Sequence, residues 1–346
     1  MEILYKSIHL IDLDNNICMS IKCAEGMDGY FDQLITYVTK LETGRNYRSR
    51  KPDAAVVAGA KEISKNTGDQ ELFEKHSEAS AGRLLAMEQR AQSKIDRLGA
   101  RVQRGSLVQA LVSVEGQSNL RYVLAKVEHI DFVDDLDFST KSGFDMDYEK
   151  KIWKTCVLNL SSTEEKTPAF ICSDTDAKYW YADFLEMEEC NANAVNTKNA
   201  YEAIEKLLKK RKLREKSVYD CMILQNAITC RFMKDEQLDY ENMIVDIFDR
   251  YKPVKLSADD MQSLRNDLRA LPGDRFDKQF TPDQEYMKTK IKNTYDITEG
   301  IQLQIRGGID DLEQVISSEE TTDGTIFLKI KTSQRNVDLM PLKKKV

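Results

Sequence analysis

The stretch Ser106–Val133 constrains the fold most, because it holds two strand-like segments separated by a short polar loop. Leu107–Val114 and Leu120–Glu128 are rich in Val, Leu and Tyr, which favour β-strands. The polar residues 115–119 between them include a glycine, which can adopt the positive φ that a tight turn needs. The pattern predicts an antiparallel hairpin at the centre of a small sheet.

The second of these strands has two different faces, because successive side chains point to opposite sides of a sheet. One face is apolar and carries Val123, Ala125, Val127 and His129. The other is mixed and carries Tyr122, Leu124, Lys126 and Glu128. The alternation predicts a half-covered sheet packed under helices.

Length and composition indicate a soluble cytoplasmic protein with no membrane association. A chain of 346 residues is long enough for two domains, each with its own core. Charged residues make up 32% of it, and no apolar run approaches the roughly 20 residues that span a bilayer. The N-terminus shows no secretory signal pattern. The seven cysteines include no CxxC pair, so neither a disulfide framework nor a zinc site is expected.

Hydrophobic periodicity predicts an α+β fold with two domains, residues 1–195 and 196–346. The N-terminal domain is expected to combine an antiparallel or mixed sheet with packed helices. Its further elements are expected to be a hairpin (Ile3–Ile11, Ile17–Ile21), helices Asp28–Leu41 and Ala54–Ile63, a basic loop Thr43–Pro52, a long helical region Asp69–Arg104, strands Lys151–Leu160 and Ala169–Cys172, and a helix Thr175–Met187.

The C-terminal domain is expected to be mainly helical and closed by a small terminal sheet. Four helices are predicted, at Ala200–Leu213, Ser217–Met233, Tyr240–Tyr251 and Ser257–Leu271. Asn199 with Glu202, and Ser257 with Asp260, are the expected N-terminal caps. The terminal strands Gly300–Arg306 and Thr325–Lys331 alternate apolar residues, which are expected to face inward.

Cations recur at helical spacing in the segment Asp69–Arg104. The set is Arg83, Arg90, Lys94, Arg97, Arg101 and Arg104. On one continuous helix these side chains would share an arc of roughly 80° and a length on the order of 30 Å, close to the ~34 Å of one duplex turn. The stripe therefore suggests a phosphate-binding surface. The alternative is a solvated face whose arginine stems cover apolar surface.

A second group of cations lies at the end of the expected helix Ala200–Leu213. Its members are Lys206, Lys209, Lys210, Arg211, Lys212 and Arg214. They surround the helix instead of lining one face. A solvated helix end, where cations are favoured, is therefore an alternative to DNA contact.

The acidic segment 131–149, together with the following Lys150, carries seven acids against two lysines. The spacing is not that of a calcium loop. We expect an acidic connecting segment or a docking surface for a protein partner.

No catalytic pattern is complete. The three histidines do not form HExxH, and no GxSxG, Walker-type or GxGxxG motif occurs. The segment Pro282–Lys288 has the residue types of a metal-dependent nuclease, whose carboxylates must converge on one ion. The sequence favours a binding protein that is not an enzyme and has no cofactor, with a nuclease as a competing hypothesis.

Several segments together resemble the bacterial nucleoid-associated family NdpA/YejK. They are Tyr122–Val127, Cys156–Leu160, Phe184–Ala192, Gly300–Ile305 and Gly324–Ile330. The resemblance implies a two-domain α+β protein of the nucleoid that binds double-stranded DNA as a homodimer. It supplies no DNA-contact residues, so the two basic groups are the candidates. The alternative is a DNA-sensing or effector subunit of an antiphage defence module that acts through a protein partner.

Overall fold

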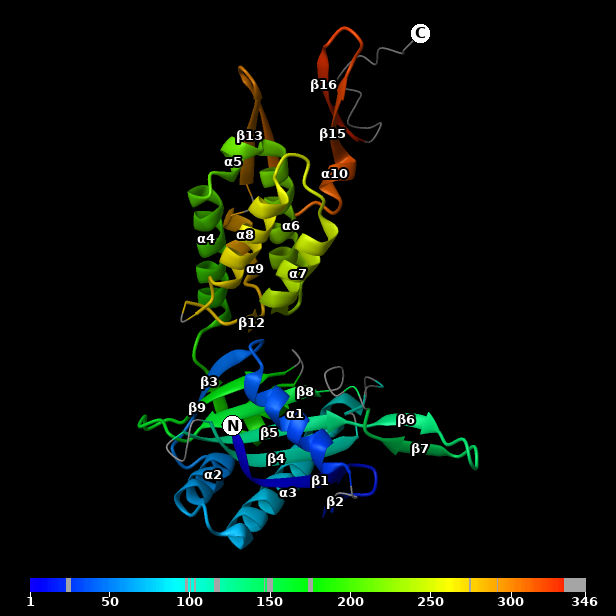
Figure 1. The fold of residues 1–346 in the computed structure, drawn as a ribbon, viewed down its shortest axis with the longest axis vertical. Helices are drawn as coiled ribbons and strands as arrows, with labels where there is room; N and C mark the ends of the chain where they lie inside the picture. The colour runs from blue at the N-terminus through cyan, green and yellow to red at the C-terminus, as the bar shows by residue number, and fades with distance from the viewer. Residues whose placement is uncertain are drawn as a thin grey trace. The chain divides into compact units, whose positions relative to one another are not determined.

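The computed structural model describes residues 1–22, 26–96, 99, 101–102, 104–114, 119–145, 147, 152–173, 177–273, 275–290 and 292–332. The chain forms two compact units (Figure 1). Unit 1 comprises Met1–Val195 with Phe276–Thr281, and unit 2 comprises Asn196–Arg275 with Pro282–Val346. The mixture of helices and strands confirms the α+β class. Among the residues described, no helix combines the length and the apolar character needed to cross a membrane.

Unit 1 is built on an eight-stranded antiparallel sheet of order β10-β3-β9-β8-β5-β4-β1-β2. Its strands are β1 (Glu2–Asp12), β2 (Ile17–Ser20), β3 (Arg45–Ser49), β4 (Gly105–Ser113), β5 (Leu120–Glu128), β8 (Ile152–Asn159), β9 (Pro168–Cys172) and β10 (Met187–Glu189). The central β4–β5 hairpin and the β1–β2 hairpin at the sheet edge confirm their predictions. The predicted basic loop Thr43–Pro52 is wrong, because Arg45–Ser49 pairs with β9 and β10.

Helices cover both faces of this sheet, so the half-covered sheet is a wrong prediction. Helix α1 (Asp28–Lys40) packs on the face that contains Val108, Val123 and Val157. Helices α2 (Ala55–Lys65) and α3 (Gln70–Ile95) cover the opposite face with the short π-helix η3 (Tyr179–Phe184). Strand β4 is therefore buried along its whole length. The prediction took the mixed face of β5 to be open to solvent because it carries a lysine. That lysine, Lys126, is buried with a charged partner.

Helix α3 ends earlier than its sequence pattern suggests. Asp69 caps its N-terminus by accepting a hydrogen bond from the Leu72 amide at 2.9 Å. The helix stops at Ile95, and Gly99 adopts a φ of +66° before the chain enters β4. The prediction of helix as far as Arg104 is wrong because the chain must turn back to reach the centre of the sheet.

The predicted helix Thr175–Met187 is shorter and wider than expected. Residues 174–176 lie outside the described part, and the π-helix η3 leads directly into β10. Trp180, Phe184 and Leu185 are buried as predicted, whereas Tyr179 is half-buried. These side chains pack against the face of the sheet that α2 and α3 cover.

A short segment from late in the chain, Phe276–Thr281, belongs to unit 1. The Asp277 carboxylate accepts hydrogen bonds from the backbone amide and side-chain amide of Asn46, at 3.0 and 2.8 Å. Arg45 lies 3.7 Å from the same carboxylate and 2.8 Å from Glu189. The segment thus attaches to β3 through charge and hydrogen bonds that no local sequence pattern indicated.

Unit 2 contains a helical cluster and two separate hairpins. The helices are α4 (Asn193–Lys210), α5 (Leu213–Lys216), α6 (Val218–Lys234), α7 (Tyr240–Arg250), α8 (Ala258–Arg269), α9 (Gln284–Lys290) and α10 (Leu312–Val315). Helices α6, α7 and α8 confirm their predictions, as does the Ser257–Asp260 capping box. Helix α4 begins at Asn193, so the prediction of a cap at Asn199 is wrong; Asn199 lies inside the helix.

The terminal strands form two hairpins and not one closing sheet. Strands β13 (Lys292–Thr298) and β14 (Ile301–Arg306) pair with each other, as do β15 (Ile316–Glu320) and β16 (Ile326–Ile330). Ile305 is buried, but Ile301 is exposed. All five residues of β16 are exposed. The expectation that the apolar residues of both strands face inward is therefore wrong for most of them.

Candidate nucleic-acid interface

The six-residue basic stripe predicted in unit 1 does not form along one helix. Helix α3 carries Arg83, Arg90 and Lys94. Arg97 lies outside the described residues, and Arg101 and Arg104 follow the end of the helix. The prediction of a continuous helical stripe is wrong, because the helix is too short to hold all six.

Two of these arginines have structural partners. The Arg83 guanidinium donates to the carbonyl oxygens of Phe184 at 2.8 Å and Asp183 at 2.7 Å, and lies 3.3 Å from the Glu186 carboxylate. It therefore supplies donors to the carbonyls at the end of η3. The Arg104 guanidinium lies 3.1 Å from the buried Asp12 carboxylate. Hydrogen bonds from Asn15 lower the pKa of Asp12, and the charge of Arg104 adds to that shift.

Helix α3 also contributes a buried ion pair to the core. Glu88 is fully buried and pairs with Lys126, which projects from β5 and is only 1% exposed. The Tyr179 hydroxyl donates to the same Glu88 carboxylate at 3.2 Å. Burial lowers the pKa of Lys126, and the negative charge of Glu88 opposes that shift. Of the predicted stripe, only Arg90 and Lys94 remain as exposed cations on this helix, and the other exposed cation, Lys75, lies near its opposite end. Helix α3 therefore offers little to a phosphate backbone.

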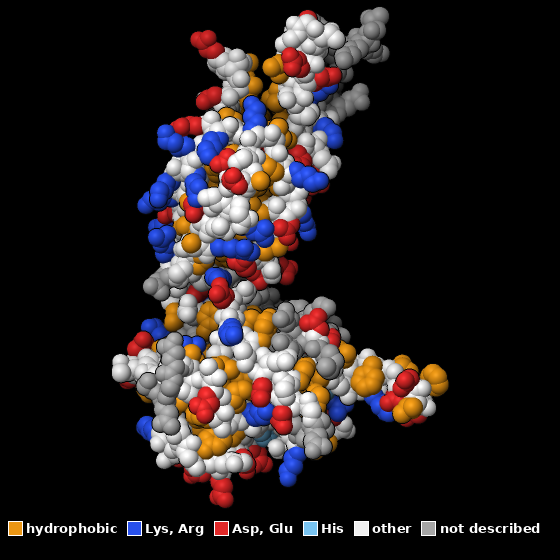
Figure 2. Space-filling view, in the orientation of Figure 1, with side chains coloured by type: hydrophobic (Ala, Val, Ile, Leu, Met, Phe, Trp, Pro, Cys, Tyr) orange, Lys and Arg blue, Asp and Glu red, His pale blue; other side chains and the backbone are white. Residues whose placement is uncertain are grey.

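The cations at the end of α4 divide into two groups. Arg211 pairs with Asp267, and the Lys212 ammonium lies 3.2 Å from Glu215. Lys206, Lys209 and Lys210 are exposed, and none of the three makes an ion pair with a described residue. Because residues three and four apart share a helix face, these ammonium groups lie close together. Figure 2 shows blue side chains gathered along the flank of unit 2 that α4 forms.

A hollow of about 460 Å³ lies beside this group, between the end of α4, α5 and the start of β13. Its charged lining consists of the cations Lys209, Lys212, Arg214 and Lys292 and the anions Glu205 and Glu215. The lining therefore carries two more positive than negative charges. Leu208, Leu213 and Cys221 are buried and form its apolar lining.

The fold holds Arg214 at the rim of this hollow. Its guanidinium donates to the Thr294 carbonyl oxygen at 3.0 Å and lies 4.7 Å from the centre of the Tyr295 ring. Burial raises the pKa of Tyr295 to about 12, although the charge of Arg214 acts in the opposite direction. Arg214 is thus positioned by backbone and aromatic contacts, while its charge is not cancelled by a carboxylate among the described residues.

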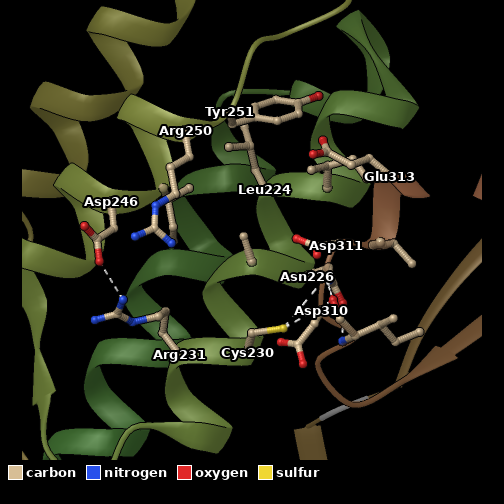
Figure 3. Close-up of a pocket in the computed structure, with 15 residues that line it drawn as sticks. Leu224, Asn226, Cys230, Arg231, Asp246, Arg250, Tyr251, Asp310, Asp311 and Glu313 are labelled. Carbon is tan, nitrogen blue, oxygen red and sulfur yellow. Dashed lines mark hydrogen bonds and ion pairs between the residues drawn. The ribbon is translucent and has the colours of Figure 1, made fainter. Parts of the chain in front are cut away.

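A second cavity in unit 2, of about 230 Å³, has two cations and four carboxylates in its lining, so acids predominate there (Figure 3). On one side the Arg231 guanidinium lies 2.8 Å from Asp246 and 2.7 Å from Asp235. Figure 3 shows Asp310, Asp311 and Glu313 on the opposite side. The Asn226 side chain donates to the Ile309 carbonyl at 2.7 Å and accepts from the Ile309 amide at 3.0 Å, so it ties the two walls together.

The Cys230 thiol in the lining of this second cavity is not activated. The Cys230 thiol donates to the Ile309 carbonyl at 3.5 Å, and burial raises its pKa. A protonated thiol is a poor nucleophile. The nuclease-like segment also has a structural role, because Asp283 accepts a hydrogen bond from the Tyr286 amide at 2.7 Å at the start of α9. Among the described residues, no group of His, Cys, Asp and Glu is arranged to hold a metal ion.

Much of the acidic segment 131–149 forms a hairpin in unit 1. Strands β6 (Ile130–Val133) and β7 (Thr140–Gly143) pair with each other, and residues 146 and 148–149 lie outside the described part. In the turn, the exposed fractions of Leu136 and Phe138 are 89% and 81%, and Phe138 adopts a φ of +54°. Its role as a partner surface stays a prediction.

Comparison with protein-family models, with curated proteins and with solved structures found no match to this chain. The candidate interface therefore depends on geometry and charge alone.

Proposed function

We propose that this protein binds the phosphate backbone of double-stranded DNA through the basic surface of unit 2 and has no catalytic step of its own. The surface consists of Lys206, Lys209, Lys210, Lys212, Arg214 and Lys292. The observation that carries the proposal is the group of three exposed lysines on α4 that have no carboxylate partner among the described residues. The likeness to the NdpA/YejK segments points the same way and stays a prediction.

Charge segregation supports this proposal despite the net charge of −7. Elsewhere in unit 2, several arginines are paired with carboxylates, as in Arg231–Asp246 and Arg269–Glu241. A local concentration of unpaired cations releases counterions when it meets phosphates, and this release drives binding regardless of overall charge. Lysine ammonium groups are point charges that contact phosphates without reading bases, so we expect little sequence preference.

The test is a salt titration of binding to a labelled short duplex, followed by fluorescence anisotropy. Five or six phosphate contacts predict a slope of about −5 for log affinity against log salt concentration. Reversing two contacts in Lys206→Glu/Lys210→Glu should weaken binding at least about tenfold and reduce the slope by about 2.

The chain offers a matched control on α3. Arg90→Glu/Lys94→Glu also reverses two exposed cations four residues apart on a helix, and it changes net charge by the same amount. We expect it to change affinity less than about threefold, since overall charge alone has a small effect at moderate salt. Equal losses in the two variants would contradict the assignment to unit 2. Absence of wild-type binding at low salt would contradict DNA binding itself.

The β6–β7 hairpin favours a second candidate function, that of an effector subunit acting through a protein partner. A bulky residue at positive φ is strained, and Phe138 also leaves its ring in water. Acids Asp134, Asp135 and Asp137 surround it, which suits a basic partner surface with an apolar pocket. The test is recovery of a specific protein by the wild type and not by Leu136→Ser/Phe138→Ser, followed by reconstitution from the purified components.

A further inference from the structure

The β15–β16 hairpin of unit 2 lacks the packing that normally stabilises two strands. In Figure 1 it extends from the helices as a two-stranded ribbon. Ile316 is its only buried residue. The exposed fractions of Ile326, Phe327, Leu328 and Ile330 are 71%, 50%, 41% and 47%. Because an isolated two-stranded hairpin is marginally stable in water, this one requires additional pairing or cover.

The two outer edges of this hairpin differ in chemistry. Strand β15 presents two serines and two glutamates, Ser317–Glu320, which discourage association. Strand β16 has the sequence Ile-Phe-Leu-Lys-Ile, with one charge, no proline and no register shift against β15. Among the described residues it pairs with β15 alone. The edge of β16 therefore has almost none of the features that protect an edge strand from pairing.

One antiparallel register of β16 with itself pairs all five of its residues without placing like charges opposite each other. If two copies pair antiparallel about Leu328, each Ile326 lies opposite Ile330 of the other copy and Leu328 lies opposite itself. Each Lys329, whose ammonium group also pairs with Glu319 of its own hairpin, then lies opposite a Phe327 ring of the other copy, which is a favourable position for a cation. Parallel pairing in register, or an antiparallel slip centred on Lys329, would place like charges opposite each other. A one-residue slip would mix the apolar and polar faces.

We propose that two copies of this chain associate through β16 in that antiparallel register, which gives a four-stranded sheet of order β15-β16-β16-β15. The residues Ile326, Leu328 and Ile330 of the two copies then form one apolar strip across the two central strands, and Ile316 extends it beside Ile330 in each hairpin, whereas Ser318 and Glu320 flank the rest of it. A five-residue edge buries much less surface than the ~1,200–2,000 Å² of stable interfaces, so the dimer dissociates on dilution. The association is independent of DNA and is measured in its absence.

Site-specific disulfides test the register directly. Directly opposite residues in an antiparallel pair have Cα atoms about 4.5–5.5 Å apart, which a disulfide can bridge. Under mild oxidation we expect Leu328→Cys to give covalent dimers. Ile326→Cys is the matched control on the same strand face, since its own copy would be too distant, at roughly 3.4 Å per residue over four residues. Mixing Ile326→Cys with Ile330→Cys should restore the cross-link, and the wild type measures the background from native cysteines.

Sedimentation equilibrium over a range of concentrations tests the association without cross-linking. The wild type should shift from monomer to dimer as concentration rises. Phe327→Lys places a lysine opposite Lys329 of the other copy and should weaken dimerisation at least about tenfold. Its exposed position predicts an unchanged circular dichroism spectrum.

Three results would overturn the proposal. They are a wild type that stays monomeric at all concentrations, Leu328→Cys cross-linking no better than Ile326→Cys, and a Phe327→Lys dimer as tight as that of the wild type. None of them depends on DNA, so failure of this proposal is distinguishable from failure of the DNA-binding proposal.

Discussion

Helices α3 and α4 both carry cations at helical spacing, but their cations have different surroundings. On α3, Arg83 binds backbone carbonyls at the end of η3, and the nearby acid Glu88 is buried with Lys126. On α4, Lys206 and Lys210 are exposed and have no ion pair with a described residue. The comparison teaches that periodicity alone does not separate a cation that stabilises a fold from one available to a ligand. The partners decide, and they come from distant parts of the chain.

The largest effect should come from breaking the buried pair on α3. Glu88→Ala leaves Lys126 buried without its counter-charge, and we expect a loss of about 3–5 kcal/mol in the free energy of unfolding. Urea denaturation followed by tryptophan fluorescence measures it, because both tryptophans, Trp153 and Trp180, belong to unit 1. Replacing both partners, in Glu88→Leu/Lys126→Met, should restore most of the stability. A single variant as stable as the wild type would contradict this role.

Arg83 should show the next largest effect. Arg83→Ala removes two hydrogen bonds to carbonyl oxygens and a contact with Glu186, so we expect unit 1 to lose about 1.5–3 kcal/mol. Arg90→Ala, on the same helix but exposed, should stay within about 0.5 kcal/mol of the wild type in the same fluorescence experiment. If Arg83→Ala instead weakened DNA binding without loss of stability, the distinction between α3 and α4 would fail.

The stability of unit 1 should also fall between neutral and mildly acidic pH. Burial, with the charges of Arg104 and Lys126, lowers the pKa of His129 from 6.5 to about 4. The unfolded chain therefore binds more protons between these values, and stability falls as pH drops from 6.5 towards 4. We expect His129 to account for about 1–2 kcal/mol of the loss between pH 6.5 and 5.

Denaturation at the two pH values, compared with His129→Gln, isolates this contribution. Glutamine can keep a hydrogen bond with Ser106, which lies 3.0 Å from the histidine ring nitrogen. Burial also lowers the pKa of His9, so the variant should retain part of the pH dependence. An identical pH dependence in wild type and variant would show that His129 does not titrate in this range.

The smallest effect on stability should come from the α4 lysines. Lys206→Ala/Lys210→Ala removes two exposed charges that have no described ion-pair partner, and we expect a change within about 0.5 kcal/mol. Circular dichroism at the helix wavelength during thermal unfolding provides the measurement. A large destabilisation would mean that these lysines serve the fold as Arg83 does, and would weaken their assignment to DNA.

The sequence by itself determined the elements whose signals are local. Alternation and turn residues predicted the β4–β5 hairpin, and the 3.6-residue period predicted α1, α2, α6, α7 and α8. The Ser257–Asp260 capping box was also readable, because its two partners lie three residues apart. Both basic groups were visible in the sequence, but their roles were not.

Tertiary structure decided what depends on contacts distant in sequence. From the sequence alone, Lys126 would be interpreted as a solvent-facing residue. In the fold it is buried against Glu88, thirty-eight positions away. From the sequence alone, Arg83 would be interpreted as part of a DNA-binding stripe. In the fold its guanidinium donates to carbonyl oxygens of η3, about a hundred residues later in the chain. Burying a charge without a partner is unfavourable in free energy, whereas leaving it in water is not. The role of a charged side chain therefore depends on whether the fold provides a partner. Only the folded chain shows which cations have such partners and which remain free for a ligand.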